Sequence, residues 1–271
     1  MAPRRMTVAD LLKTRGTRQL SMLHVRSLEE ATAAGAAGID LLSIVDPLWT
    51  PEMRAAAPEC FVIVGLLYGQ LVTTEDYLRA AHRALAIGGD AVYCAASLET
   101  ISRLRAEGIP VCGHTGLIPS KRTWTGGFRA VGTTHDTAML VYRQIRELET
   151  AGAFAAEIEV VPERVASEIS RRSSLLLLSM GAGRGCHAQY LFAEDVLGFT
   201  AGHLPRHAKV YRDFRSEFTR LQRERVAAFQ EFSNDVRIGA YPAAEHLVGI
   251  PDAEFEAFLV DIDQEKLGRK P

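Results

Sequence analysis

The sequence has few features of a membrane, disulfide-linked or nucleic-acid-binding protein. Its four cysteines are far apart, lie mostly in apolar runs and lack zinc-site spacing, which is typical of reduced thiols in the cytoplasm. No apolar run is long enough to span a bilayer, and none follows the arginines of "MAPRRMTVADLLKTRG" as it would in a signal peptide. The 31 Lys and Arg are spread among 33 Asp and Glu. We therefore expect a cytoplasmic protein with neither a membrane nor a nucleic acid as partner.

A dinucleotide-binding fingerprint is also absent. No G-x-G-x-x-G follows the first apolar run, which argues against a doubly wound sheet that binds such a cofactor. The stretch "GAGRG" at 181–185 follows a predicted strand, but alone it indicates a tight turn more than a phosphate loop. With 271 residues and 47% hydrophobic composition, the chain can still build one large core.

Apolar runs of strand length alternate with helical patterns along most of the chain. Such continuous apolar strands are typical of a parallel sheet that helices cover on both faces. Seven units are clear, and a weaker eighth strand is predicted within 199–211, after a helix over 188–198. This predicts a (β/α)8 TIM barrel, one domain over 1–271 with a C-terminal helical extension over 213–271. An open doubly wound sheet is the alternative. The predicted strands are 18–23, 39–45, 60–67, 90–96, 109–117, 153–161 and 175–183.

The ends of these strands carry the candidate site. In a barrel, the carboxyl ends of all strands open into one mouth, where chemistry takes place. Side chains scattered through the sequence would therefore meet there. They are His24, Asp46, Gly65, Tyr93, His114 and Glu159.

Several motifs follow one another in an order that resembles a known family. They are "GIPVCGHTGLIPS", "TGGFRAVGTT", "ETAGAFAAEIEVVPERVASEIS", "MGAGRGCHAQYLFAEDVLG" and "RIGAYPAAEHLV". Together they resemble ketopantoate hydroxymethyltransferase (3-methyl-2-oxobutanoate hydroxymethyltransferase), of the phosphoenolpyruvate mutase/isocitrate lyase superfamily. The resemblance covers nearly the whole chain and is most specific from Gly108 onward.

The resemblance implies an aldol-type transfer on the route to pantothenate. In the family, Mg2+ holds the α-keto acid 2-oxoisovalerate and stabilises its enolate, and 5,10-methylenetetrahydrofolate supplies the one-carbon unit. A glutamate removes the proton, and Glu159 matches it. His114 matches the histidine beside that base, and Asp46 matches the first metal-binding aspartate. The superfamily also implies a homo-oligomer that packs through its C-terminal extension.

Other positions depart from the family pattern. The serine that follows the first aspartate is here Pro47, which has no hydroxyl. The second metal aspartate aligns with Gly65, and the family's lysine and glutamate align with Tyr93 and Ala95. The connection after Asp46 is also shorter than in the family. Asp46 is thus the only clear metal ligand that remains, whereas the Glu159–His114 half is intact.

Each candidate residue also has a plain structural interpretation. His114 could be a core histidine, although the motif favours a site role, and a buried carboxylate such as Glu159 is costly unless paired or functional. Glu157 has the same strand parity and could form the ion pair instead. For Asp46, a turn and a metal site are equally good interpretations. Asp46, Tyr93 and His24 are the candidates for substrate contact; a core aromatic is the alternative for Tyr93, and a strand-end histidine for His24.

Three functions remain open from the sequence. The first is a hydroxymethyltransferase of the ketopantoate type, with Glu159 as base and Asp46 as metal ligand. The second is a diverged enzyme that forms or breaks a carbon–carbon bond on a different keto acid. The third is a barrel that binds a small molecule or serves as an oligomer subunit without catalysis.

Overall fold

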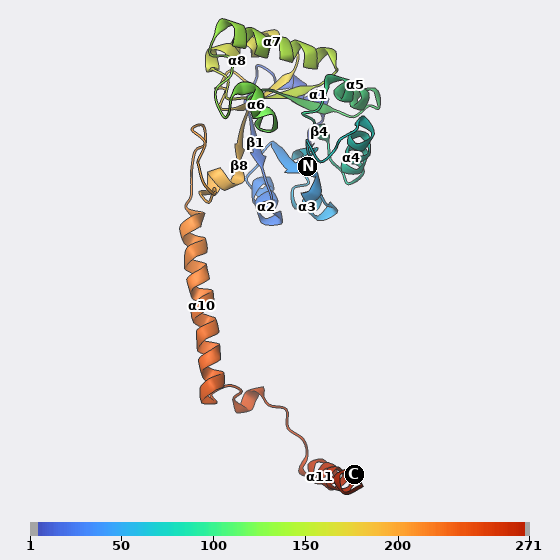
Figure 1. The fold of residues 1–271 in the computed structure, drawn as a ribbon, viewed down its shortest axis with the longest axis vertical. Helices are drawn as coiled ribbons and strands as arrows, with labels where there is room; N and C mark the ends of the chain where they lie inside the picture. The colour runs from blue at the N-terminus through green and yellow to red at the C-terminus, as the bar shows by residue number, and fades with distance from the viewer. Residues whose placement is uncertain (1–4, 269–271) are drawn as a thin grey trace. The chain divides into compact units, whose positions relative to one another are not determined.

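Eight short parallel strands form a closed barrel in which each strand pairs with the next in the chain and β8 pairs with β1. The computed structural model describes residues 5–268. Figure 1 shows the strands at the centre and the helices around them. The predicted (β/α)8 barrel is confirmed. The strands are β1 (Leu20–His24), β2 (Leu41–Val45), β3 (Phe61–Gly65), β4 (Ala91–Tyr93), β5 (Val111–Gly116), β6 (Ala155–Glu159), β7 (Leu176–Met180) and β8 (Ala188–Phe192).

Helices follow most strands and cover the outside of the barrel. Several begin with a Thr or Ser cap; Thr73 and Thr134, for example, accept hydrogen bonds from the first turns of α4 and α7. The helices are α1 (Val8–Lys13), α2 (Leu28–Ala36), α3 (Pro51–Ala56), α4 (Thr74–Ala86), α5 (Leu98–Ala106), α6 (Arg122–Thr125), α7 (His135–Thr150), α8 (Glu163–Arg172), α9 (Ala193–Leu197), α10 (Phe214–Ile238) and α11 (Asp252–Gly268), with 3-10 turns η1 (Asp46–Leu48), η2 (Pro119–Lys121) and η3 (Ala244–His246).

Successive side chains along each strand point alternately into the barrel and outward, against the helices. Residues of one parity pack inside the barrel, and those of the other parity pack against the helices. The interior is apolar toward the amino ends of the strands. It is polar toward the carboxyl ends of β4, β5 and β6. Its apolar lining includes Leu20, Met22, Leu41, Phe61, Ile63, Ala91, Cys112, Ala155, Leu176, Leu178 and Ala188.

The eighth strand lies elsewhere than the sequence indicated. The first seven strands fall where they were predicted, but β8 occupies Ala188–Phe192, the first half of a predicted helix. The described segment 199–211 contains no strand. The register explains the difference, because Ala188 and Tyr190 alternate into the barrel between β7 and β1. Only Ala193–Leu197 of the predicted helix is helical.

The chain divides into two compact units, Met1–Phe214 and Arg215–Pro271. The first contains the barrel. The second contains most of α10 and all of α11. Its boundary lies next to residue 213, where the sequence predicts the extension to begin. Within residues 5–268, no helix combines the length and apolarity that crossing a bilayer requires.

Candidate active site

Three neighbouring strands, β4, β5 and β6, place polar side chains of the same parity inside the barrel. On β5 the inward positions include Cys112 and His114, and on β6 they include Glu157 and Glu159. The register sets His114 beside Glu157. His114, Glu157 and Glu159 are buried, and Tyr93 at the end of β4 is partly exposed.

His114 lies between the two carboxylates and binds two further groups. Its Nε2 donates to the carbonyl of Leu117 at 2.9 Å, and the Tyr93 hydroxyl lies 2.7 Å from its Nδ1. A carbonyl can only accept, so Nε2 carries a proton and a neutral ring accepts from Tyr93 at Nδ1. Glu157 Oε2 lies 3.5 Å from Nδ1, and Glu159 Oε2 lies 3.3 Å from Nε2.

Glu159 presents a carboxylate oxygen that no hydrogen bond satisfies. Its Oε2 is buried and has no hydrogen-bond partner in the described structure. His114 Nε2 is close, but its proton is directed at Leu117. A buried acceptor left without a partner costs about 1–3 kcal/mol, so such an atom calls for a functional explanation.

The backbone around Glu159 is held in an uncommon conformation. Val160 has φ 49°, a left-handed value that is rare for a β-branched residue. It is fixed there because its N–H donates to Met180 and its carbonyl accepts from Val131. On the other side, Gly116 has φ 85°, and a Cβ there would lie 2.3 Å from the Glu159 carbonyl oxygen. Strain of this kind gathers at functional sites.

Burial and like charge act strongly on Glu157. Desolvation raises the pKa of its carboxyl to about 7; His114 opposes the rise, and Glu159 adds to it. Burial likewise raises the pKa of Tyr93 well above its ordinary value, with Glu157 as the next cause. Near neutral pH, this cluster can therefore hold or release a proton at Glu157 while Tyr93 keeps its own.

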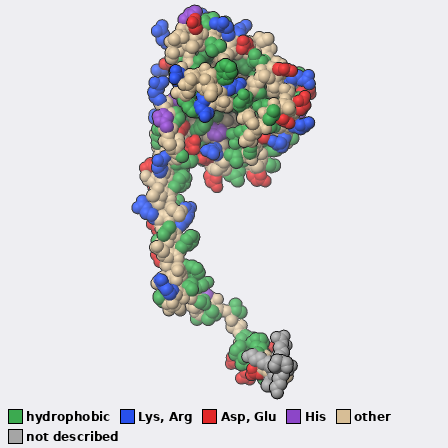
Figure 2. Space-filling model, viewed as in Figure 1, with side chains coloured by type: hydrophobic (Ala, Val, Ile, Leu, Met, Phe, Trp, Pro, Cys, Tyr) green, Lys and Arg blue, Asp and Glu red, His purple; other side chains and the backbone are tan. Residues whose placement is uncertain are grey.

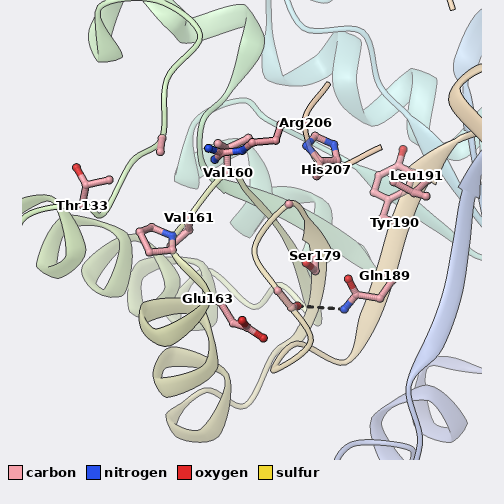
Figure 3. Close-up of a pocket in the computed structure, with 14 residues that line it drawn as sticks. Thr133, Val160, Val161, Glu163, Ser179, Gln189, Tyr190, Leu191, Arg206 and His207 are labelled. Carbon is pink, nitrogen blue, oxygen red and sulfur yellow. Dashed lines mark hydrogen bonds between the residues drawn. The ribbon is translucent and has the colours of Figure 1, made fainter. Parts of the chain in front are cut away.

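A cavity of about 660 Å³ lies at the carboxyl ends of β6, β7 and β8 (Figure 3). Arg206 and His207 reach it from the segment after α9, and its lining includes Val160, which follows Glu159, and Tyr190 of β8. Arg206 is the only Lys or Arg among its described lining residues. His207 packs so closely on the turn after β7 that a Cβ at Gly181 would lie 2.8 Å from its Nδ1.

Comparison with known proteins identifies the family of this chain. The model of ketopantoate hydroxymethyltransferase matches residues 48–244, a span that contains His114 and Glu159. The chain belongs to this family. It is 32% identical to 3-methyl-2-oxobutanoate hydroxymethyltransferase of Thermotoga neapolitana, over 89% of this chain and 96% of that protein. The Thermus thermophilus protein of that name is 33% identical over 89% of this chain and 99% of its own length.

Solved structures agree on the architecture. 2,3-Dimethylmalate lyase, a member of the PEP mutase/isocitrate lyase superfamily, aligns with a TM-score of 0.52 over 96% of this chain and 99% of its own. The two sequences are 15% identical, so this likeness concerns the fold alone.

The positions expected to bind a metal do not form a ligand set in this member of the family. Asp46 lies in η1 after β2, and its carboxylate pairs with Arg83 of α4. Gly65 at the end of β3 and Ala95 after β4 have no donor atoms. Among the residues that the structure describes, no group of three or more His, Cys, Asp or Glu side chains could hold a metal ion. The donor set therefore does not fit Mg2+, which needs carboxylates free to bind it.

His24 occupies the inner face of β1, where it contacts side chains of β2 and β8. Its Nδ1 lies 3.4 Å from Ser43 Oγ, and its ring packs 4.7 Å from that of Phe192. Burial, and after it the charge of Arg26, lowers the pKa of His24 to about 4, so the ring is neutral near pH 7.

The structure thus brings together three of the five predicted site residues, Tyr93, His114 and Glu159. It adds Glu157, which the sequence offered as an alternative. It also adds Arg206 and His207, which sequence reasoning missed. The glycine-rich turn at 181–185, on which His207 packs, was the only sequence feature that pointed to them. The segment that carries Arg206 and His207 has no helix or strand from which their position could be predicted.

Proposed function

We propose that this protein catalyses an aldol-type transfer of a one-carbon unit to an α-keto acid, as its family name indicates, with 2-oxoisovalerate as acceptor. The observation that supports this best is the unsatisfied Oε2 of Glu159. A general base needs a lone pair that no protein donor occupies. It also needs surroundings that exclude water, and Glu159 is buried.

Glu159 removes the proton on C3, next to the keto group. The electron pair of that bond moves into the new C2–C3 double bond, and negative charge collects on the keto oxygen. The enol or enolate then forms a carbon–carbon bond from C3 to the one-carbon unit. With 5,10-methylenetetrahydrofolate, the donor that the family implies, both C–N bonds to that carbon break, water supplies the hydroxyl group and tetrahydrofolate leaves. His114 acts as a positioning residue, because its ring keeps the carboxylates of Glu157 and Glu159 apart.

The substrate carboxylate needs a cationic partner, and Arg206 is suited to that role. A guanidinium binds a carboxylate through two parallel hydrogen bonds. Arg206 has no ion-pair or hydrogen-bond partner within residues 5–268, and it borders the cavity that Val160, the residue after Glu159, also lines. Tyr93 and His24, which are half-buried at the carboxyl ends of β4 and β1, would contact the rest of the keto acid.

One observation favours the diverged enzyme as a second candidate. Asp46 is paired with Arg83, and Gly65 and Ala95 offer no ligands, so the residues present do not support a step on Mg2+. A site altered at these positions could accept a keto acid other than 2-oxoisovalerate. The base and its proton would keep their roles in that reaction.

We also propose that the protein forms a homo-oligomer through α10. Leu221, Phe229, Phe232 and Val236 are exposed, and they fall within an arc of about 80° on an ideal helix. Figure 2 shows hydrophobic side chains along this helix. An apolar stripe of this kind marks a protein contact. Light scattering of a Phe229→Glu, Phe232→Glu variant should give a smaller particle than the wild type; an equal mass would contradict the proposal.

Deuterium exchange tests the catalytic proposal. The protein is incubated with 2-oxoisovalerate in deuterated buffer, and the C3 proton is followed by NMR. We expect exchange that falls by about 1,000-fold in Glu159→Gln, within the range for a positioned general base. The control Glu168→Gln alters an exposed carboxylate on α8 and should keep the wild-type rate. An equal rate in Glu159→Gln would remove the base from that role, and no exchange with any α-keto acid would favour a binding protein.

A further inference from the structure

The acid cluster lacks a cation in a place where the proposed reaction generates negative charge. Among the described residues, the only ion-pair partner of Glu157 and Glu159 is His114. When Glu159 takes the C3 proton, its negative charge moves to the substrate and collects on the keto oxygen. Since the donor set does not fit a metal, another group must take up the charge that collects on the keto oxygen.

Tyr93 is the least buried member of the cluster. It is half-buried, whereas His114, Glu157 and Glu159 are buried. Its neighbour on β3 is Gly65, which has no side chain to cover it. An added Cβ at Gly65 would make only ordinary contacts, the nearest 3.7 Å from the Ile44 carbonyl oxygen, so this position is not tightly packed.

We infer that Tyr93 acts as a catalytic acid that protonates the keto oxygen in place of a metal ion, and that Glu157 replaces its proton through His114. This inference rests on the proposed function. It depends on the positions of three groups, because His114 Nδ1 lies close to both the Tyr93 hydroxyl and Glu157 Oε2. The first of these distances is 2.7 Å and the second is 3.5 Å.

The step balances without any further reactant. Glu159 takes the C3 proton, the electron pair of that bond forms the C2–C3 double bond, and the carbonyl π pair becomes a lone pair on oxygen. The Tyr93 proton moves to that oxygen and gives a neutral enol. Glu157 passes its proton to the unprotonated Nδ1 of His114, and the resulting imidazolium gives a proton from Nδ1 to the Tyr93 oxygen. The net change moves one proton from Glu157 to the substrate and one from the substrate to Glu159.

The charges around Glu157 suit it as the reservoir. The titratable groups that face it are His114, Glu159, Tyr93, Tyr190 and Cys112. Burial raises the pKa of Glu157 to about 7, so a proton is present at neutral pH and is not held too tightly to leave. His114 Nε2 keeps its proton and donates it to the Leu117 carbonyl throughout, which leaves Nδ1 as the nitrogen that relays.

A chelator experiment tests the inference. Deuterium exchange into 2-oxoisovalerate is measured for the full-length protein after EDTA treatment, and again with added Mg2+. We expect equal rates in both, and a loss of about 100-fold in Tyr93→Phe. The control Tyr77→Phe changes a buried tyrosine of α4 outside the cluster and should exchange at the wild-type rate.

A second variant keeps the test independent of whether Tyr93→Phe folds. In Glu157→Gln, the dependence of the exchange rate on pH near 7 should disappear, because the group that supplies the proton to Tyr93 no longer titrates. Exchange that stops with EDTA and returns with Mg2+ would overturn the inference and leave the proposed function standing. An unchanged rate in Tyr93→Phe, or an unchanged pH profile in Glu157→Gln, would also overturn it. No exchange under any condition would overturn both proposals.

Discussion

Glu157→Gln should change how the stability of the protein depends on pH. In the folded protein, the pKa of Glu157 is raised from 4.5 to about 7, chiefly by burial. The unfolded chain releases this proton near pH 4.5, and the folded chain holds it to about pH 7. Between these values the folded state binds more protons, so this group makes stability fall as pH rises.

The magnitude follows from the size of the shift. One pKa unit corresponds to about 1.4 kcal/mol, so a rise from 4.5 to about 7 gives roughly 3 kcal/mol. The stabilisation is fully present below about pH 4.5 and is lost by pH values above 7. Most of the loss falls between about pH 5 and pH 8. A glutamine has a similar shape and no titration, so the variant should lack this part of the slope.

Urea unfolding at about pH 5 and pH 8 measures the effect in both proteins. The wild type should lose roughly 2–3 kcal/mol more than Glu157→Gln between the two conditions. All other groups titrate in both proteins, so the comparison isolates Glu157. Glu107→Gln, an exposed carboxylate at the end of α5, controls for the loss of a charge. Parallel pH profiles for wild type and Glu157→Gln would refute the account of the buried carboxylate.

Three further variants test other parts of the site. Arg206→Gln should raise KM for the keto acid about tenfold, with a smaller effect on kcat. The control Lys209→Gln, three residues along the chain, should change neither constant. If wild type and Arg206→Gln have equal KM values, Arg206 does not bind the substrate carboxylate. Gly116→Ala should destabilise the protein by about 3 kcal/mol or more in urea unfolding, because its Cβ would collide with Glu159, whereas Gly108→Ala, at a similar φ with open space, should cost about 1–2 kcal/mol. Asp46→Asn should lower the free energy of unfolding by less than about 1 kcal/mol, because the Arg83 side chain of this ion pair is 59% exposed. It should leave the rate of deuterium exchange unchanged. Loss of exchange in this variant would indicate that Asp46 binds a metal.

The barrel was predictable because most of its strands are continuous apolar runs between helices. That pattern located seven strands and failed for β8, where Gln189 interrupts a short strand that continues directly into α9. The sequence around Ala188–Phe192 alone does not distinguish these two structures. The closure of the barrel by pairing with β1 decides between them.

Strand parity also predicted part of the site. It placed His114, Glu157 and Glu159 on one side of neighbouring strands. It could not predict that the Tyr93 hydroxyl reaches His114, because that contact depends on the register between β4 and β5. Nor could it pair Asp46 with Arg83, since an ion pair between residues 37 positions apart depends on how α4 packs on the barrel.

A crystal structure with 2-oxoisovalerate bound tests the central claim most directly. The account predicts that C3 lies about 3–3.5 Å from Glu159 Oε2, the separation of a reactive arrangement. A keto acid bound with C3 directed away from Glu159, or with a protein hydrogen bond occupying Oε2, would contradict it.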